Sequence, residues 1–349
     1  MPQRIGYIDA LRGFTMLLVV FSHVETFSYG IKYNESLLSS FIMSFFMPMF
    51  FFISGYMTYR KEKLSWKEYI KKIKNRFVRL VIPAFLIFHI YFTFFRNAPI
   101  DLFFTKGPLG FWFTFVLFEM YLIYYTTLLL LFKQSPNKTN FILIGLGIFG
   151  QVIFLGSIGH YYNLETYPIL TLTNTTRYFI FFILGIVCKQ NEETFIKLIN
   201  NDYIRTSLII LYIISLTLEW NKYLLPHYSI LHVLNFEIII QYLGVFLIFT
   251  LFYYYSKNFE KNNIIIKNLR LIGRHTLDIY LLHWFFLPSF SFMKECFIGN
   301  KNLLAEFYLT ITIVIAVISL CLFISYALRA SHFLGYYLWG DKNNYKKDE

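Results

Sequence analysis

Two ionisable side chains in the first apolar stretch have a spacing that suits proton-transfer chemistry. Asp9, Arg12 and His23 lie on one stripe along a helix. Together with two apolar residues between Arg12 and His23, they follow one another at steps of three or four residues, which keeps them on the same helix face. His is the side chain that titrates near neutral pH, so His23 can act as a general base with a cation on the same face. The alternative interpretation is that Arg12 reaches the lipid headgroups and His23 hydrogen-bonds a neighbouring helix.

Further candidates stand in two later segments. Arg76 and Arg79 share a helix face at i and i+3, which suits bidentate contact with the phosphates of a cosubstrate. Positive charge flanking a membrane span is the alternative explanation for this pair. Glu119 stands near the middle of an apolar segment, on the same face as Trp112 seven residues earlier. Its carboxyl group is either protonated and structural or orients a cation or a His, and we count it among the candidate catalytic groups.

A second histidine occurs near the end of the chain. Thr276, Tyr280 and His283 fall on one face of a helix expected over 272–290, whereas Asp278 points elsewhere. His283 is either a second imidazole of the site or a polar tie between helices. The three cysteines have neither paired nor metal-ligand spacing, so we expect buried thiols and no metal site.

The composition indicates that a membrane protein positions these residues. Of the 349 residues, 57% are hydrophobic and only 15% are charged, which is more apolar surface than a soluble chain of this size can bury. The same composition excludes disordered, fibrous and disulfide-scaffold proteins. Because the first apolar stretch contains Asp9, Arg12 and His23 and no cleavage site follows it, we expect it to remain in the mature protein.

The apolar segments predict an all-α, polytopic membrane bundle of about ten transmembrane helices. A spanning helix needs roughly 20 mostly apolar residues. The sixth and seventh segments are the weakest, because their charge-free parts are short. The ten segments lie near 8–28, 38–59, 77–95, 110–132, 140–158, 172–188, 205–219, 236–255, 272–290 and 304–328.

The basic residues predict the orientation of the bundle. Most of the 32 Lys and Arg fall between spans on one side, which places both termini in the cytoplasm. The net charge of +12 therefore reflects topology and contact with membrane lipids, and we expect no nucleic-acid partner. No linker or repeat divides the chain, so residues 1–349 are predicted to form a single membrane domain with a short cytoplasmic tail from about 330.

The ordered set of motifs resembles the integral-membrane acyltransferase family 3. The family's first-helix motif, an Arg or Lys followed by ten residues and His, is matched by Arg12 and His23, and its Arg-x-x-Arg motif by Arg76 and Arg79. Segments 50–56, 177–185 and 279–283 are similar to family segments in the same order. The likeness spans about residues 4–330, and the ordered set is specific although each motif is short.

This resemblance implies an O-acyltransferase of the cytoplasmic membrane. Members of the family transfer an acyl group, usually acetyl from cytoplasmic acetyl-CoA, to a hydroxyl group of an extracytoplasmic polysaccharide or glycolipid. Carried over by position, His23 is the catalytic histidine, Arg12 is its motif partner, and Arg76 and Arg79 contact acyl-CoA. Because the thioester is already activated, acetyl-CoA serves as cosubstrate and no bound cofactor is expected.

Several mechanistic alternatives remain open from the residues alone. Arg12 stabilises either the developing oxyanion or the CoA pyrophosphate. A covalent relay through His23 or Ser22 ranks below direct attack by the acceptor, because Ser22 adjoins His23 on the helix and faces away from it. The alternative function is a polytopic transporter or flippase of polysaccharide precursors, which would be expected to carry inverted repeats that this sequence lacks.

Overall fold

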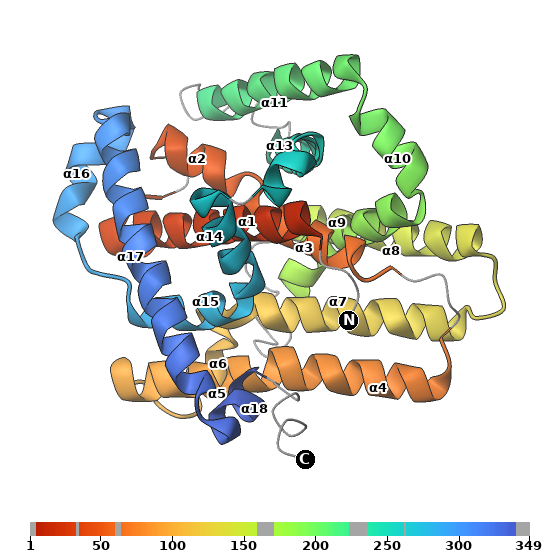
Figure 1. Cartoon of the computed structure of the whole chain (residues 1–349), viewed down its shortest axis with the longest axis horizontal. Helices are drawn as coiled ribbons and strands as arrows, with labels where there is room; N and C mark the ends of the chain where they lie inside the picture. Colours follow the sequence, from red (N-terminus) through yellow and green to blue (C-terminus); the bar gives the residue numbers. More distant parts are fainter. Residues whose placement is uncertain are drawn as a thin grey trace. The chain divides into compact units, whose positions relative to one another are not determined.

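The computed structural model describes residues 5–32, 35–59, 64–158, 171–222, 236–261 and 263–339. Every regular element in these ranges is a helix, which confirms the predicted all-α class (Figure 1). Eight helical segments of the described chain are long and apolar enough to cross a membrane. They are Gly6–Tyr29, Leu37–Tyr56, Trp66–Phe95, Leu109–Leu130, Pro136–Leu155, Asp202–Asn221, Glu237–Tyr254 and Leu303–Arg329.

The ninth expected span is broken into short pieces. The prediction of one helix over 272–290 was wrong, because α14 (Ile264–Arg274) ends at the start of that segment and α15 (Thr276–Leu282) has only seven residues. A 3-10 turn, η7 (His283–Phe285), follows α15. Helical structure ends at Phe285, and the irregular residues 287–290 that follow include Pro288, which has no backbone N–H to donate to a helix.

The sixth expected span is a helix that falls outside the set of eight. It corresponds to α9 (Leu172–Gln190), which is helical throughout. Its charge-free part is confined to residues 178–188, bounded by Arg177 and Lys189. The predicted number of about ten spans is therefore an approximation.

The chain divides into two compact units. The first contains the described residues of Met1–Ile53 and Asn191–Phe323, and the second contains those of Ser54–Gln190 and Ile324–Glu349. Each unit is described separately below.

In the first unit, α1 (Gly6–His23) is the central helix. It packs along α14 and also contacts α13 (Phe236–Tyr254) and α15, so residues far apart in sequence lie side by side (Figure 1). The helices α1 and α14 cross at Gly13 and Gly273, where a Cβ atom on Gly273 would lie 1.8 Å from the carbonyl oxygen of Asp9. Glycine at the crossing is what lets the two backbones approach this closely.

The chain leaves α1 through a π-helical turn, η1 (Val24–Tyr29), which ends at Gly30 with φ 80°. This left-handed conformation favours glycine, and it turns the chain toward α2 (Leu37–Met43). A buried cluster that includes Phe45 and Tyr212 then packs α11 (Asp202–Lys222) against α13. The first unit thus holds α1 on several sides with apolar contacts.

In the second unit, one long helical segment follows the basic cluster. It begins at α4 (Trp66–Arg76), whose first turn is closed by a capping box between Ser65 and Glu68. The segment continues through the π-helical turn η2 (Phe77–Val81) into α5 (Ile82–His89), and Figure 1 shows α4 and α5 in one line. The helix therefore starts about three turns before the third span expected from hydropathy.

Three more helices complete the packing of the second unit. The helix α7 (Trp112–Leu130) packs against α4, and α8 (Pro136–Ile158) lies along α9. In the segment that the sequence assigns to a tail, α18 (His332–Trp339) packs against α5.

The remaining helices of the two units are α3 (Phe46–Tyr56), η3 (Ile90–Phe95), α6 (Leu102–Lys106), η4 (Leu109–Phe111), α10 (Glu192–Ile199), η6 (Ser256–Glu260), η8 (Ser291–Met293), α16 (Lys294–Phe297), η9 (Ile298–Asn300) and α17 (Leu303–Arg329).

Candidate active site

The two histidines singled out in the sequence form a direct pair in the first unit. His23 ends α1 and is half-buried, and its Nδ1 lies 2.6 Å from Nε2 of the fully buried His283. The other ring nitrogen of His283, Nδ1, lies 3.0 Å from the carbonyl oxygen of Ile279. His283 therefore makes the polar tie between helices that was one of its two expected roles, while a role as a second imidazole of the site stays a prediction.

The hydrogen bond to Ile279 determines the tautomers of a neutral pair. A carbonyl oxygen only accepts, so His283 must carry its proton on Nδ1 and present a lone pair at Nε2. His23 then donates from Nδ1 to that lone pair. The proton-free nitrogen of His23 is consequently Nε2, which is the atom that a general base uses.

Aromatic rings flank the His23 imidazole. The ring of Trp284 lies 4.7 Å from the His23 ring and that of Phe27 lies 5.5 Å from it. The Phe27 side chain is 56% exposed. Sequence reasoning missed both rings, although Phe27 is one helical turn beyond His23 and Trp284 follows His283 directly. Tyr280 is buried behind the pair, with its ring 6.1 Å from that of His283.

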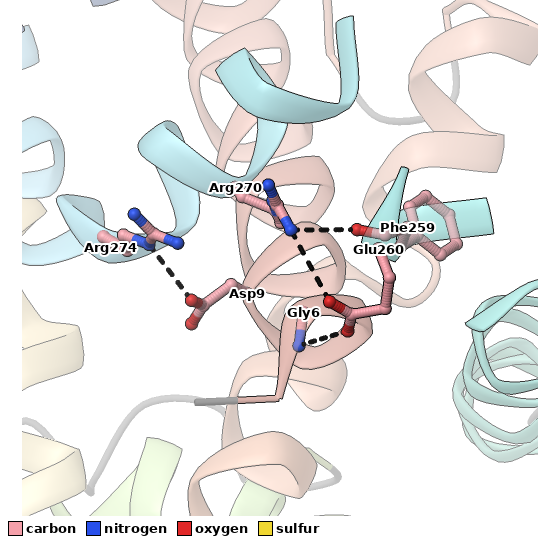
Figure 2. Close-up of polar contacts among 6 residues, drawn as sticks. All are labelled: Gly6, Asp9, Phe259, Glu260, Arg270 and Arg274. Atoms are coloured by element: carbon pink, nitrogen blue, oxygen red, sulfur yellow. Dashed lines mark hydrogen bonds and ion pairs between the residues drawn. The ribbon is translucent and has the colours of Figure 1, made fainter. Parts of the chain in front are cut away.

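The other members of the helical stripe attach α1 to its neighbours. Arg12 donates from Nη2 to the hydroxyl oxygen of Thr276, 2.9 Å away. Asp9 accepts from Nε of Arg274 at 3.2 Å, a contact that Figure 2 shows between α1 and α14. The stripe predicted from spacing is therefore real, but its three polar residues contact different partners from 274 to 283.

A capping contact fixes the start of α1. Glu260 accepts the backbone N–H of Gly6 through Oε1 at 3.1 Å, so a carboxylate stands at the helix N-terminus where negative charge is favourable (Figure 2). Nη1 of Arg270 lies 3.7 Å from Oε2 of Glu260 and donates to the carbonyl oxygen of Phe259 at 3.2 Å. These contacts set the position along α14 at which α1 begins, and hence the level of His23.

The paired arginines of the second unit have different surroundings. The Arg76 guanidinium lies 4.0 Å over the ring of Tyr121 and hydrogen-bonds Tyr125, so it attaches α4 to α7. The ammonium nitrogen of Lys72 lies 5.1 Å from the centroid of the Tyr125 ring. Arg79 is exposed. The shared helix face expected from the i, i+3 spacing thus contains one packed and one exposed guanidinium.

The carboxylate of Glu119 lies at the start of α9. Its Oε1 accepts from the backbone N–H of Thr171 at 3.1 Å and from the Thr171 hydroxyl at 3.0 Å, and its Oε2 accepts from the Thr175 hydroxyl at 2.5 Å. These bonds connect α7 to the N-terminus of α9 and favour the structural interpretation, while a catalytic role for Glu119 stays a prediction. Trp112 stacks on Tyr178 with centroids 6.0 Å apart.

Within the described residues, no group of three or more His, Cys, Asp or Glu side chains is placed to hold a metal ion. The first unit supplies an imidazole oriented by the hydrogen bond between His23 and His283. The second unit contributes guanidinium and ammonium groups on aromatic rings.

Comparison with known proteins gives one match. A family model described as an acyltransferase domain matches residues 5–330. No curated protein and no solved structure matches the chain significantly. The matched range contains the histidine pair and both arginines.

Proposed function

This chain belongs to acyltransferase family 3, and we propose that it moves an acyl group, most commonly acetyl, from cytoplasmic acyl-CoA to a hydroxyl of an extracytoplasmic polysaccharide or glycolipid. Family membership and the apolar helices make it a multi-pass membrane acyltransferase. The donor, the acceptor, the role of His23 and the cytoplasmic membrane as its location are the proposed parts.

The histidine pair carries this proposal. His23 Nε2 takes the proton of the acceptor hydroxyl while the hydroxyl oxygen attacks the carbonyl carbon of the thioester. The C–S bond breaks, and the thiolate takes the proton from the His23 imidazolium. The products are an ester and free CoA, with His23 returned to its neutral form.

His283 supports both protonation states of His23. In the neutral state it accepts from His23 Nδ1 and keeps the lone pair on Nε2. When Nε2 gains a proton, Nδ1 still donates to His283, so the imidazolium keeps a hydrogen-bond acceptor at 2.6 Å. His283 is thus a positioning residue, while His23 contacts the reacting atoms.

The surroundings of His23 support direct attack rather than a covalent relay through Ser22. The Ser22 hydroxyl is buried and donates to the carbonyl oxygen of Val19 at 2.9 Å. A hydroxyl held by its own helix does not face the imidazole next to it. Direct transfer to the acceptor, with His23 as base, is the route that we propose.

Arg12 is better placed to bind the phosphates of the donor than to stabilise the reacting carbonyl group. It lies about 16 Å from His23 along α1 at 1.5 Å per residue, which is beyond contact with an oxyanion beside the imidazole. Its hydrogen bond to Thr276 holds it at that level. We therefore propose a role in binding the phosphates of acyl-CoA for Arg12 in the first unit and, separately, for Arg76 and Arg79 in the second.

The rings beside His23 suit a sugar acceptor. An exposed aromatic ring stacks against the apolar C–H face of a pyranose, and Phe27 and Trp284 lie 4.9 Å apart next to the imidazole. A hydroxyl of a sugar stacked there would stand within reach of His23 Nε2. This supports a glycan as the acyl acceptor.

The test compares His23→Ala with the adjacent Ser22→Ala. Membranes that contain each protein at equal level receive labelled acetyl-CoA, and the label in the glycan and glycolipid fractions is counted. His23→Ala should lower the incorporation by about 100-fold or more, because a general base contributes on that scale. Ser22→Ala should keep most of it. Incorporation by His23→Ala at nearly the wild-type level would overturn the proposal, and loss in Ser22→Ala would favour a relay.

A further inference from the structure

The second unit contains an open pocket that the proposed reaction has not used. Side chains from the cytoplasmic end of α7, from the start of α8 and from the end of α9 line it, including Tyr124, Leu128, Asn140 and Gln190. All of these lie in one compact unit with Arg76 and Arg79.

The lining combines aromatic walls with a pair of amides. Tyr59, Tyr124 and Phe132 supply ring surface. Nδ2 of Asn140 donates to Oε1 of Gln190 at 2.9 Å, which leaves Oδ1 of Asn140 as an acceptor and Nε2 of Gln190 as a donor. An acceptor beside a donor complements the N6 and N7 positions of adenine, and amide side chains pair with adenine in this manner.

Several basic residues are neighbours of the lining residues in sequence or through one aromatic ring. Lys133 directly follows Phe132, and its ammonium nitrogen lies 5.5 Å from the Phe132 ring centroid. Lys189 directly precedes Gln190. On the other side, the Tyr124 ring lies 5.3 Å from that of Tyr125, which carries Lys72 and bonds Arg76. Phosphates attached to a group in the pocket would therefore meet positive charge in either direction.

We propose that this pocket binds the adenine nucleotide end of acyl-CoA, an assignment that rests on the proposed function for the choice of donor. The adenine ring stacks between the aromatic walls, and its edge pairs with Asn140 and Gln190. The phosphates lie near the surrounding lysines and Arg76, and the pantetheine arm extends away from the pocket. The predicted topology places these lysines in the cytoplasm, which is where CoA is found.

An anionic phospholipid would present the same phosphate chemistry without a base. The two ligands differ in the aromatic walls and the amide pair, which a lipid headgroup does not need. The probe is therefore adenosine 3′,5′-bisphosphate, which carries the nucleotide end of CoA and lacks the thiol arm, with pantetheine as the arm-only counterpart.

The experiment measures binding of these two probes to purified full-length protein. Leu128→Trp fills the pocket, and the control Leu129→Trp places the same ring one position along α7, outside the lining. Leu128→Trp should weaken adenosine 3′,5′-bisphosphate binding roughly tenfold or more, which corresponds to losing one good contact. Leu129→Trp should leave it unchanged, and neither variant should alter pantetheine binding.

Gln190→Met gives a second variant that keeps the size of the side chain and removes the amide. It should also weaken the nucleotide probe, by severalfold. If both Leu128→Trp and Gln190→Met bind the nucleotide as tightly as the wild type, the assignment of this pocket is overturned. Displacement of the probe by anionic phospholipid vesicles alone would also overturn it. Transfer from acetyl-CoA that is unaffected by these variants would leave the proposed function standing without the pocket. Nucleotide binding by a protein that shows no acyl transfer would leave the pocket standing and count against the proposed function.

Discussion

At the scale of single residues, the orientation of one hydrogen bond decides what His23 can do. A fully buried His283 with its Nδ1 bound to a backbone carbonyl can only accept from His23 in the neutral pair, so in the proposed reaction it keeps Nε2 of His23 free to act as the base. Its role is comparable to that of the groups that orient metal-bound histidines, which fix tautomer and ring direction from behind.

Replacing His283 tests this positioning role. His283→Ala removes the acceptor and lets the His23 ring turn, so kcat should fall by about 10- to 100-fold, the scale expected for a misplaced catalytic group. The KM for acetyl-CoA should stay close to wild type. His283→Gln offers an amide oxygen as a new acceptor and should recover part of kcat. Steady-state kinetics of the three proteins measure the difference, and an equal loss in both variants would refute an orienting role.

The two arginines should respond differently to the same change. Arg79→Lys keeps the charge but loses the bidentate fork, so it should raise the KM for acetyl-CoA severalfold without changing thermal stability. Arg76→Lys also gives up the contact with Tyr121 and should cost about 1 kcal/mol of stability. Kinetics and thermal melts of both variants test this. Unchanged KM values in both would make these residues topology signals only.

The sequence predicted the types and spacing of the site residues better than their partners. Arg12 and His23 lie on one helix, so the period of the helix alone placed them on one stripe. Their partners are distant in sequence, because Thr276 lies 264 residues from Arg12 and His283 lies 260 residues from His23. Such contacts depend on how α1 packs on α14 and α15, and the hydropathy pattern carries no information about this packing.

At the scale of helices, the crossing of α1 and α14 aligns the polar stripe with its partners. The crossing depends on Gly13 and Gly273, where added Cβ atoms would lie 1.9 and 1.8 Å from backbone carbonyl oxygens. Because backbone atoms cannot turn aside as flexible side chains do, the helices would have to separate. The hydrogen bonds of Asp9 and Arg12 lie nearest to the crossing and would be the first to be lost.

Gly273→Ala should therefore destabilise the protein by about 1–3 kcal/mol, the usual cost of overpacking. Gly145→Ala is the matched control, because a Cβ there meets nothing within 4 Å and Ala favours helix over Gly. Thermal unfolding in detergent compares the two. Equal melting temperatures for both variants would contradict the tight crossing.

Apolar length predicted most of the helices but not where one of them breaks. The ninth segment reads as a continuous span by composition, yet its helix ends at Leu282 and the chain continues as η7. That break places His283 and Trp284 at the end of a short helix beside His23. Irregular backbone within a membrane protein is found where it is buried or lines a cavity, so the misplaced boundary coincides with the candidate site.

At the scale of the whole molecule, the proposed reaction has two requirements, a base for the acceptor hydroxyl and a site for the phosphates of the donor. The proposed base, His23, lies in the first unit, whereas Arg76, Arg79 and the amide-lined pocket lie in the second. CoA carries several charges and does not enter hydrocarbon, so the proposed donor requires that its phosphates be bound at an aqueous face. The basic residues predicted on the cytoplasmic side indicate which face that is.

The most direct test uses sealed vesicles in which the purified protein has one orientation. Labelled acetyl-CoA is supplied only at the face that carries both termini, and a glycan fraction from the producing cells is enclosed on the opposite side. We expect labelled glycan with the wild-type protein, at least about 100-fold less with His23→Ala, and most of the wild-type labelling with Ser22→Ala. Label that appears on the glycan only when donor and glycan share a side, or equally with His23→Ala, would contradict it.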